Sequence, residues 1–293
     1  LEGIYEAAGQ NERLFKVLET QSQLVQGPER DRVLTRMASV SSEGLADIDN
    51  SIALYRELLS KNPRNDQAFE AVTLLLEKAG RFEELRDLLL AKLQVTIDPR
   101  ELLRLNERAG RVIFQKLGQA EAAVPYFKGT LERDPRNVGA LEALRDIYEA
   151  LGRGDDLVIT LKRLIPLQEG ADGVKLIRIR LAEVVSQAGR REEALDSARR
   201  ALEVESHTVE EFGRILAVFT ALKAWPDAAK TLEARVQHHL ALHEQELAVA
   251  TLFEMAELWR TTAGKPENAG PVLERILELE PANRSAYEQA DAE

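Results

Sequence analysis

Three arginines form the clearest pattern of side chains that could bind a ligand: Arg104, Arg108 and Arg111. They follow one another at intervals of four and three residues, so on a helix they share one face. Guanidinium groups suit carboxylates, which they hold with paired hydrogen bonds. The apolar residues of the same stretch fall on the opposite face: Leu102, Leu105, Ala109, Val112 and Ile113. The pattern predicts an amphipathic helix from Pro99 to Lys116 that carries a basic stripe.

The stripe has two interpretations, because other charged residues recur at a similar spacing. Lys175 and Arg178 bring cations to a similar stretch further along, and Glu142, Asp146 and Glu149 lie between the two stretches. One interpretation is a docking site for an acidic peptide or a carboxylate. The other is that the cations pair with these carboxylates, at about 0–1 kcal/mol for each exposed pair. The sequence leaves both open.

Motifs of catalysis and of cofactor binding are missing from the sequence. It has no glycine-rich phosphate loop, no G-x-S-x-G and no H-E-x-x-H, and the absence of cysteine excludes thiolate chemistry. His239 and His243 would share a face of a continuous helix with His238 nearby, but this stretch spans a predicted connection between helices. We therefore expect exposed polar residues there, and predict a non-catalytic chain without a metal site or cofactor.

Composition narrows the partner class. The 293 residues carry a formal net charge of -11, with 30% charged and 5% aromatic residues. This acidic balance argues against nucleic acid and anionic membranes as partners, and no apolar run is long enough to span a bilayer. RNA binding through the basic stripe would require an affinity that falls steeply with salt. We expect a protein or peptide partner, and an acidic one if the basic stripe is its docking site. We also expect a cytoplasmic location, with the periplasm left open.

An internal repeat organises the whole chain. Six glycines and two other residues close apolar-periodic segments at positions 9, 46, 80, 118, 152, 189, 223 and 264. The steps between them alternate between 34 and a longer value of 37 to 41, so most pairs of steps span 71 or 72 residues. The chain is therefore a doubled module repeated four times.

Each unit reads as two amphipathic helices. Residues 67–79 and 82–93 both have apolar residues at helical spacing, and Gly80 between them allows the positive φ that ends a helix. Proline ends several second helices, and an asparagine two residues later can cap the next helix; these asparagines are Asn65, Asn137 and Asn283. Because a helix pair buries its apolar stripe only against neighbouring pairs, the pattern predicts an all-α solenoid of about sixteen helices.

These features resemble the tetratricopeptide repeat (TPR) family over nearly the whole chain. Residues that match its pattern in three units are Phe69, Val72, Leu76, Gly80, Phe82, Leu85 and Leu89, then Leu141, Leu144, Tyr148, Gly152 and Leu161, then Leu181, Ala182, Val185, Gly189, Ala194, Ala198 and Ala201. The family's small second-helix position corresponds to Leu14, Ser51, Leu85, Ala123, Leu157, Ala194, Ala228 and Ala269. Pentatricopeptide and half-tetratricopeptide repeats have similar periods, but the acidic balance disfavours them.

The resemblance implies a right-handed superhelix of antiparallel helix pairs whose first helices line a concave groove. Residues 1–293 would form a single array that starts and stops inside a repeat unit. The implied function is a protein-interaction scaffold; the alternative is a regulatory or accessory segment of a larger enzyme or sensor. Arg104 and Arg108 do not reproduce the family's peptide-carboxylate clamp. The candidate groove residues are Arg104, Arg108, Arg111, Lys175, Arg178, Glu142 and Asp146.

Overall fold

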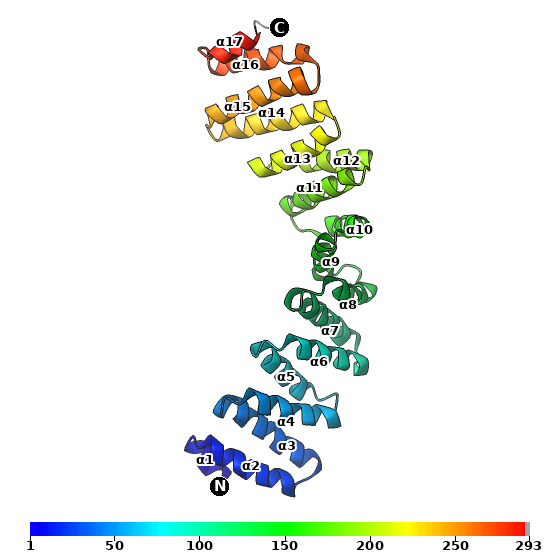
Figure 1. Cartoon of the computed structure of the whole chain (residues 1–293), viewed down its shortest axis with the longest axis vertical. Coiled ribbons are helices and arrows are strands. Elements are labelled where there is room, and N and C mark those ends of the chain that lie inside the picture. Colours follow the sequence, from blue (N-terminus) through cyan, green and yellow to red (C-terminus); the bar gives the residue numbers. More distant parts are fainter. Residues whose placement is uncertain (291–293) are drawn as a thin grey trace. The chain divides into compact units, whose positions relative to one another are not determined.

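The computed structural model describes residues 1–290, and these residues form helices joined by short connections, with no strand among them. They contain seventeen α-helices (Figure 1), and consecutive helices pack against each other from α1 to α8 and again from α10 to α17. The all-α prediction is therefore confirmed, with one helix more than the approximate count expected. No helix of the described part is long and apolar enough to cross a membrane.

The helices fall into three sets. The second helices of the pairs are α2 (Asn11–Leu24), α4 (Ile48–Lys61), α6 (Phe82–Val95), α8 (Ala120–Arg133), α10 (Gly154–Leu164), α12 (Arg191–Leu202), α14 (Trp225–Ala241) and α16 (Gly270–Leu279). The short first helices are α1 (Glu2–Ala7), α5 (Asp66–Lys78), α9 (Val138–Ala150), α13 (Val209–Ala221) and α17 (Arg284–Ala290). The remaining first helices are here called long, because the helical segment that each begins extends further before the turn. They are α3 (Gly27–Ser39), α7 (Pro99–Arg111), α11 (Ala171–Gln187) and α15 (Gln245–Glu257).

Three of the long first helices continue into a π-helical turn. These turns are η1 (Val40–Gly44) after α3, η2 (Val112–Lys116) after α7 and η4 (Leu258–Thr262) after α15. Two short 3₁₀ segments, η3 (Ile165–Leu167) and η5 (Pro266–Asn268), complete the helical structure of residues 1–290. The extra turn accounts for the long step of the repeat, and α11 instead extends as an unbroken α-helix of 17 residues.

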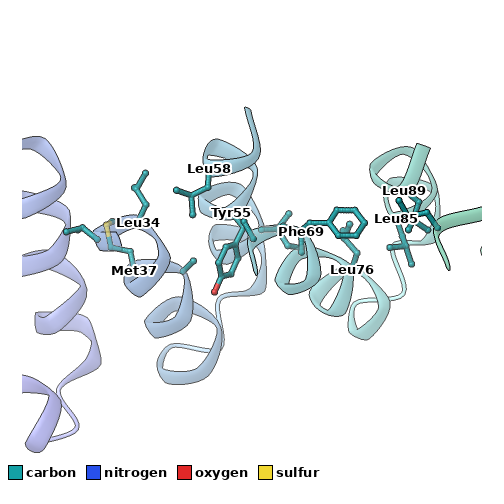
Figure 2. Packing of buried hydrophobic residues seen from close by; sticks show 14 of the residues in the cluster. Leu34, Met37, Tyr55, Leu58, Phe69, Leu76, Leu85 and Leu89 are labelled. Atoms are coloured by element: carbon teal, nitrogen blue, oxygen red, sulfur yellow. The ribbon is translucent and has the colours of Figure 1, made fainter. Parts of the chain in front are cut away.

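The chain divides into two compact units, Leu1–Ile147 and Tyr148–Glu293. In the first unit, apolar side chains from successive helices form a continuous row between them, as Figure 2 shows for Leu34, Met37, Tyr55, Leu58, Phe69, Leu76, Leu85 and Leu89. In the second unit, fully buried apolar side chains include Leu161, Val185, Phe219, Leu252, Leu273 and Ile276. Burial of this kind is the main favourable term in forming each unit.

The eight turn positions found in the sequence all have left-handed backbone geometry. Six are glycines, and the other two are Ala46, with φ of 54°, and Lys223, with φ of 53°. A side chain at such a position brings Cβ too close to the backbone, which is why glycine is favoured there. The repeat register read from the sequence is therefore confirmed in every unit, including the two units without glycine.

Relieving the strain at Ala46 should stabilise the protein. Ala46→Gly is expected to raise the free energy of unfolding by about 1 kcal/mol, and Gly80→Ala, at φ of 70°, to lower it by a similar amount. Gly213→Ala is the control: Gly213 lies inside α13 with no neighbouring atom close to a new Cβ, so alanine should stabilise it by about 0.5–1 kcal/mol. Urea unfolding measures all three, and a destabilised Ala46→Gly protein would contradict the assignment.

Helix caps and buried small residues also occur where the sequence predicts them. The side chains of Asn65, Asn137 and Asn283 accept hydrogen bonds from backbone N–H groups three residues on, at 3.0, 2.8 and 3.1 Å. All eight residues at the small second-helix position are buried, with exposed fractions of 3% or less. These local signals depend on the chain nearby and not on contacts between distant elements.

Helices α7 and α8 pack closely at Gly110. A Cβ placed on Gly110 would lie 2.7 Å from Cε2 of Phe127, which is closer than two carbons can approach. Alanine stands at the equivalent place on each of the other long first helices, as Ala38, Ala182 and Ala256. The missing methyl group of Gly110 thus makes room for the aromatic ring of Phe127.

Gly110→Ala should therefore destabilise the chain, although alanine favours a helix by about 1 kcal/mol. We expect a net loss of about 1–3 kcal/mol from overpacking. The loss should shrink in a Phe127→Leu background, because the side chain in conflict is then smaller. A double-mutant cycle by chemical unfolding measures this coupling, and additive effects would show that the contact is not responsible.

Candidate partner-binding surface

The basic stripe of α7 lies on the exposed face of a first helix. Its side chains differ in exposure: 78% for Arg104, 56% for Arg111 and 29% for Arg108. On the other side of the helix, Leu105 and Ala109 are buried at 4% and 0%. Because the apolar face is used for packing, the charged face is left to solvent and to neighbouring first helices.

Arg108 is held by the preceding short first helix. Its Nη1 lies 3.1 Å from Oε2 of Glu70, and its Nη2 lies 3.0 Å from Oε1 of Glu77. The contacts of the other two arginines are longer, at 3.9 Å from Arg104 to Glu70 and 3.7 Å from Arg111 to Glu107. Of the three arginines, only Arg108 therefore forms close ion pairs with a neighbouring helix.

The ion-pair partners differ from those suggested by the sequence. None of the pairs described for α7 involves Glu142, Asp146 or Glu149. Asp146 is exposed and accepts a hydrogen bond from the adjacent Arg145 at 2.9 Å, and Glu142 is half-buried on α9. Glu149 instead accepts a bond from Arg180 of α11 at 2.8 Å. The long first helices α3, α7 and α11 each pair with the short first helix before them, so the partner of α7 is α5.

This pairing repeats every 72 residues as a ladder of first-helix ion pairs. Arg36 of α3 contacts Glu2 and Glu6 of α1 at 2.6 and 2.7 Å, in the same register as Arg108 with α5 and Arg180 with α9. Because the paired side chains are partly exposed, each pair contributes about 0–1 kcal/mol to stability. In the fourth module Thr220 and Glu254 occupy the equivalent positions, so that pair is not formed there.

Glu183 extends the ladder between α11 and α13. Two nitrogens of Arg214 reach its carboxylate at 2.6 and 2.9 Å, and Arg180 reaches it at 3.1 Å. Burial alone would raise the pKa of Glu183, but the hydrogen bonds from both arginines lower it below its ordinary value. The carboxylate is therefore ionised and saturated by cations, and it is not available to a ligand.

A hollow of about 380 Å³ lies over α7 and η2 in the first unit. Its cationic lining is Arg104, Arg108, Arg111 and Lys116, and its carboxylates are Glu77 and Glu107. Val112 contributes an apolar part of the wall, and Leu74, which is 65% exposed, lies on α5 between Glu70 and Glu77. The hollow thus combines an excess of positive charge with apolar surface nearby.

Lys175 does not belong to this surface, contrary to the sequence-based expectation. It is buried, with 3% exposed, and its Nζ lies 2.9 Å from Glu211 and 3.1 Å from Asp172. It also donates a hydrogen bond to the Ser206 carbonyl. Two of the three equivalent residues, Leu103 and Val249, are apolar, and the third is Asp31. Lys175 thus occupies an inward position of its helix, where its ammonium group is taken up by these contacts.

Arg178 is also separate from the stripe. It lines a different hollow, of about 710 Å³, together with Arg199 and Arg200 of α12. The structure therefore brings together Arg104, Arg108 and Arg111 but places Lys175 and Arg178 in other surroundings.

A buried histidine beside Lys175 was not found from the sequence. His207 is 6% exposed, its Nε2 lies 3.1 Å from the Ala201 carbonyl oxygen, and its ring stacks on Phe212 at 4.9 Å. Burial, followed by the positive charge of Lys175, lowers the pKa of His207, although the Ala201 hydrogen bond and the carboxylates of Glu211 and Asp172 oppose this.

The other three histidines, His238, His239 and His243, have different surroundings and do not form a common metal site. His239 is buried and its Nδ1 lies 2.8 Å from Glu244, His238 packs its ring edge against Phe212, and His243 lies in the α14–α15 connection. Within residues 1–290, no three histidines or carboxylates are arranged to hold a metal ion.

Because the pKa of His207 is lowered in the folded protein, we expect the stability of the protein to depend on pH. Because the unfolded chain takes up a proton near pH 6.5 and the folded chain does so only at lower pH, stability is complete above that value and falls below it. The melting temperature of His207→Gln, which keeps a hydrogen-bond donor for the Ala201 carbonyl, should fall less between about pH 7 and pH 5 than that of the wild type. His243→Gln, with an exposed side chain, is the control; equal slopes in all three proteins would rule out the effect.

Comparison with known structures supports the fold and nothing finer. Neither a protein-family model nor a curated relative matches the sequence. The C-terminal part of a TPR repeat-containing protein from Cytophaga hutchinsonii superposes with a TM-score of 0.50 at 13% identity, covering 87% of this chain and 98% of that chain. The chain therefore has a TPR-like α-solenoid fold.

Two further solved structures are similar at lower TM-scores. A tetratricopeptide repeat protein from Parabacteroides merdae matches with a TM-score of 0.40 at 15% identity, covering 95% of each chain. YrrB, described as a TPR protein with an unusual peptide-binding site, matches with a TM-score of 0.41 at 16% identity, covering 58% of this chain and 84% of that chain.

Proposed function

We propose that this protein is a non-catalytic interaction scaffold that binds an acidic peptide or protein segment on its first helices. The binding site is the hollow over α7, and Arg104 and Arg111 are the residues that recognise the carboxylates of the partner. The observation that carries the proposal is the excess of cations around this hollow, four against two carboxylates, in a chain of net charge -11.

The three arginines have different roles in this proposal. Arg108 is fixed by Glu70 and Glu77 and shapes the floor of the site. Arg104 and Arg111 are more exposed and make only long contacts, so a carboxylate of the partner can displace those contacts at small cost. Their planar guanidinium groups can then form paired hydrogen bonds with it.

Apolar surface beside the arginines adds a second requirement for the partner. Leu74 is 65% exposed on the neighbouring α5, and Val112 lines the hollow itself. A segment with an apolar residue near its carboxylates would cover this surface, because burying apolar area favours association. This combination selects against a simple polyanion such as a nucleic acid.

Charge reversal at the two exposed arginines tests the site. Arg104→Glu/Arg111→Glu should weaken binding of a short fluorescein-labelled peptide, made of glutamates with interspersed leucines, by about tenfold. Raised salt should weaken the binding of the wild type as well. Fluorescence anisotropy measures the affinity, and thermal melts establish that the variant is folded.

Lys16→Glu/Lys128→Glu is the matched control, since it makes the same change of charge on exposed second helices of the same unit. Its affinity should stay near that of the wild type apart from the general effect of net charge. If the two double variants bind the peptide equally well, the hollow over α7 is not the binding site.

A further inference from the structure

A second groove lies on the second helices of the other unit. It has a volume of about 650 Å³ and runs between α12 and the start of α14. Arg191, Leu195 and Arg199 follow at intervals of four along the α12 wall. On the opposite side lie Lys223, in the α13–α14 turn, and Lys230, on α14. Leu195 is buried and Ala224 nearly so, which gives the groove an apolar floor.

Two lysines of this groove have no partner among the described residues. Arg199 is neutralised by Asp227 through hydrogen bonds of 2.9 and 2.7 Å, and Arg191 donates to the Leu222 carbonyl. By contrast, the ammonium groups of Lys223 and Lys230 have no ion pair or side-chain hydrogen bond within residues 1–290. They are therefore available to a ligand carboxylate.

The backbone at Lys223 is left-handed although the residue is not a glycine. Its φ of 53° is left-handed, and glycine stands at the equivalent turn after the short first helices α1, α5 and α9, as Gly9, Gly80 and Gly152. Lysine is disfavoured in this conformation, so the chain holds a cation at the mouth of the groove at a cost in stability.

A neighbouring hollow lengthens the groove. The hollow of about 710 Å³ that contains Arg178 shares Arg199 and Glu203 with it and adds Arg200. Arg178 has no ion pair in the described chain either. On α12, Arg199 and Arg200 are paired with Asp227 and Asp196. The cations of the two hollows without an ion pair are therefore Arg178 on α11, Lys223 and Lys230, and they are spread over both hollows, as the spaced carboxylates of an extended segment require.

We propose that this groove between α12 and α14 binds an acidic, extended peptide segment of a protein partner. It is a second site, on another unit and another helix layer than the hollow over α7, so the scaffold holds two acidic segments at once. The apolar floor and the carboxylates of Glu203 and Asp227 favour a peptide with spaced acidic residues over a nucleic acid.

Lys223→Gly separates binding from folding. Because glycine relieves the left-handed backbone, the Lys223→Gly/Lys230→Gln protein should melt no lower than its parent while it binds more weakly. Ala46→Gly is the matched control, since it gives the same backbone relief at an equivalent turn without removing a cation. It should raise the melting temperature and leave affinity unchanged.

The test uses the full chain and the same glutamate–leucine peptide. In an Arg104→Glu/Arg111→Glu background, the binding that remains should fall about tenfold further on adding Lys223→Gly/Lys230→Gln. If no binding remains in that background, the second groove is wrong and the proposed function stands. If the background binds like the wild type and only the lysine changes weaken it, the hollow over α7 is wrong and the groove stands.

Self-association is the remaining outcome. Analytical ultracentrifugation of the wild type and of Lys223→Gly/Lys230→Gln tests it without a peptide. A dimer that the lysine changes abolish, together with no effect of these changes on peptide binding, would show that the groove contacts a second copy and would overturn the proposal.

Discussion

Each helix pair can bury its apolar faces only against neighbouring pairs, and the rest of the structure depends on this constraint. Leu85 and Leu89 on α6 are fully buried although their helix has only the helices beside it for cover. Repeated stacking requires the chain to return at the same angle in each pair. The left-handed residue at every turn meets this requirement, even where Ala46 or Lys223 replaces glycine.

Ion pairs follow from the stacking and do not hold it together. The pairs of Arg36, Arg108 and Arg180 recur every 72 residues because the short first helices carry glutamate and the long ones arginine at facing positions. At about 0–1 kcal/mol each, they are small beside the burial of a single leucine, which contributes about 1.5–3 kcal/mol. The exposed arginines beside them are therefore free of a large structural role.

The sequence could predict the features that depend on neighbouring residues in the chain. Turn positions, the asparagine caps and the buried small residues are of this kind, and they are confirmed. The partner of Arg108 could not be predicted, because it depends on which neighbouring helix lies within reach. The burial of Lys175 could not be predicted either, because α11 packs on several sides and has no single solvent face. The equivalent residues Leu103 and Val249 indicate an inward position, but Asp31 of the first module does not.

Equivalent exposed positions on the long first helices show how one fold can carry different surfaces. On α7 all three positions are arginine: Arg104, Arg108 and Arg111. On the other long first helices the side chains at these positions differ. They are Arg32, Arg36 and Ser39 on α3, Leu176, Arg180 and Glu183 on α11, and Ala250, Glu254 and Glu257 on α15. The apolar positions of these helices keep their burial while this face changes from basic to acidic. Apolar packing does not fix the identity of these residues, so they can differ between modules while the fold is kept.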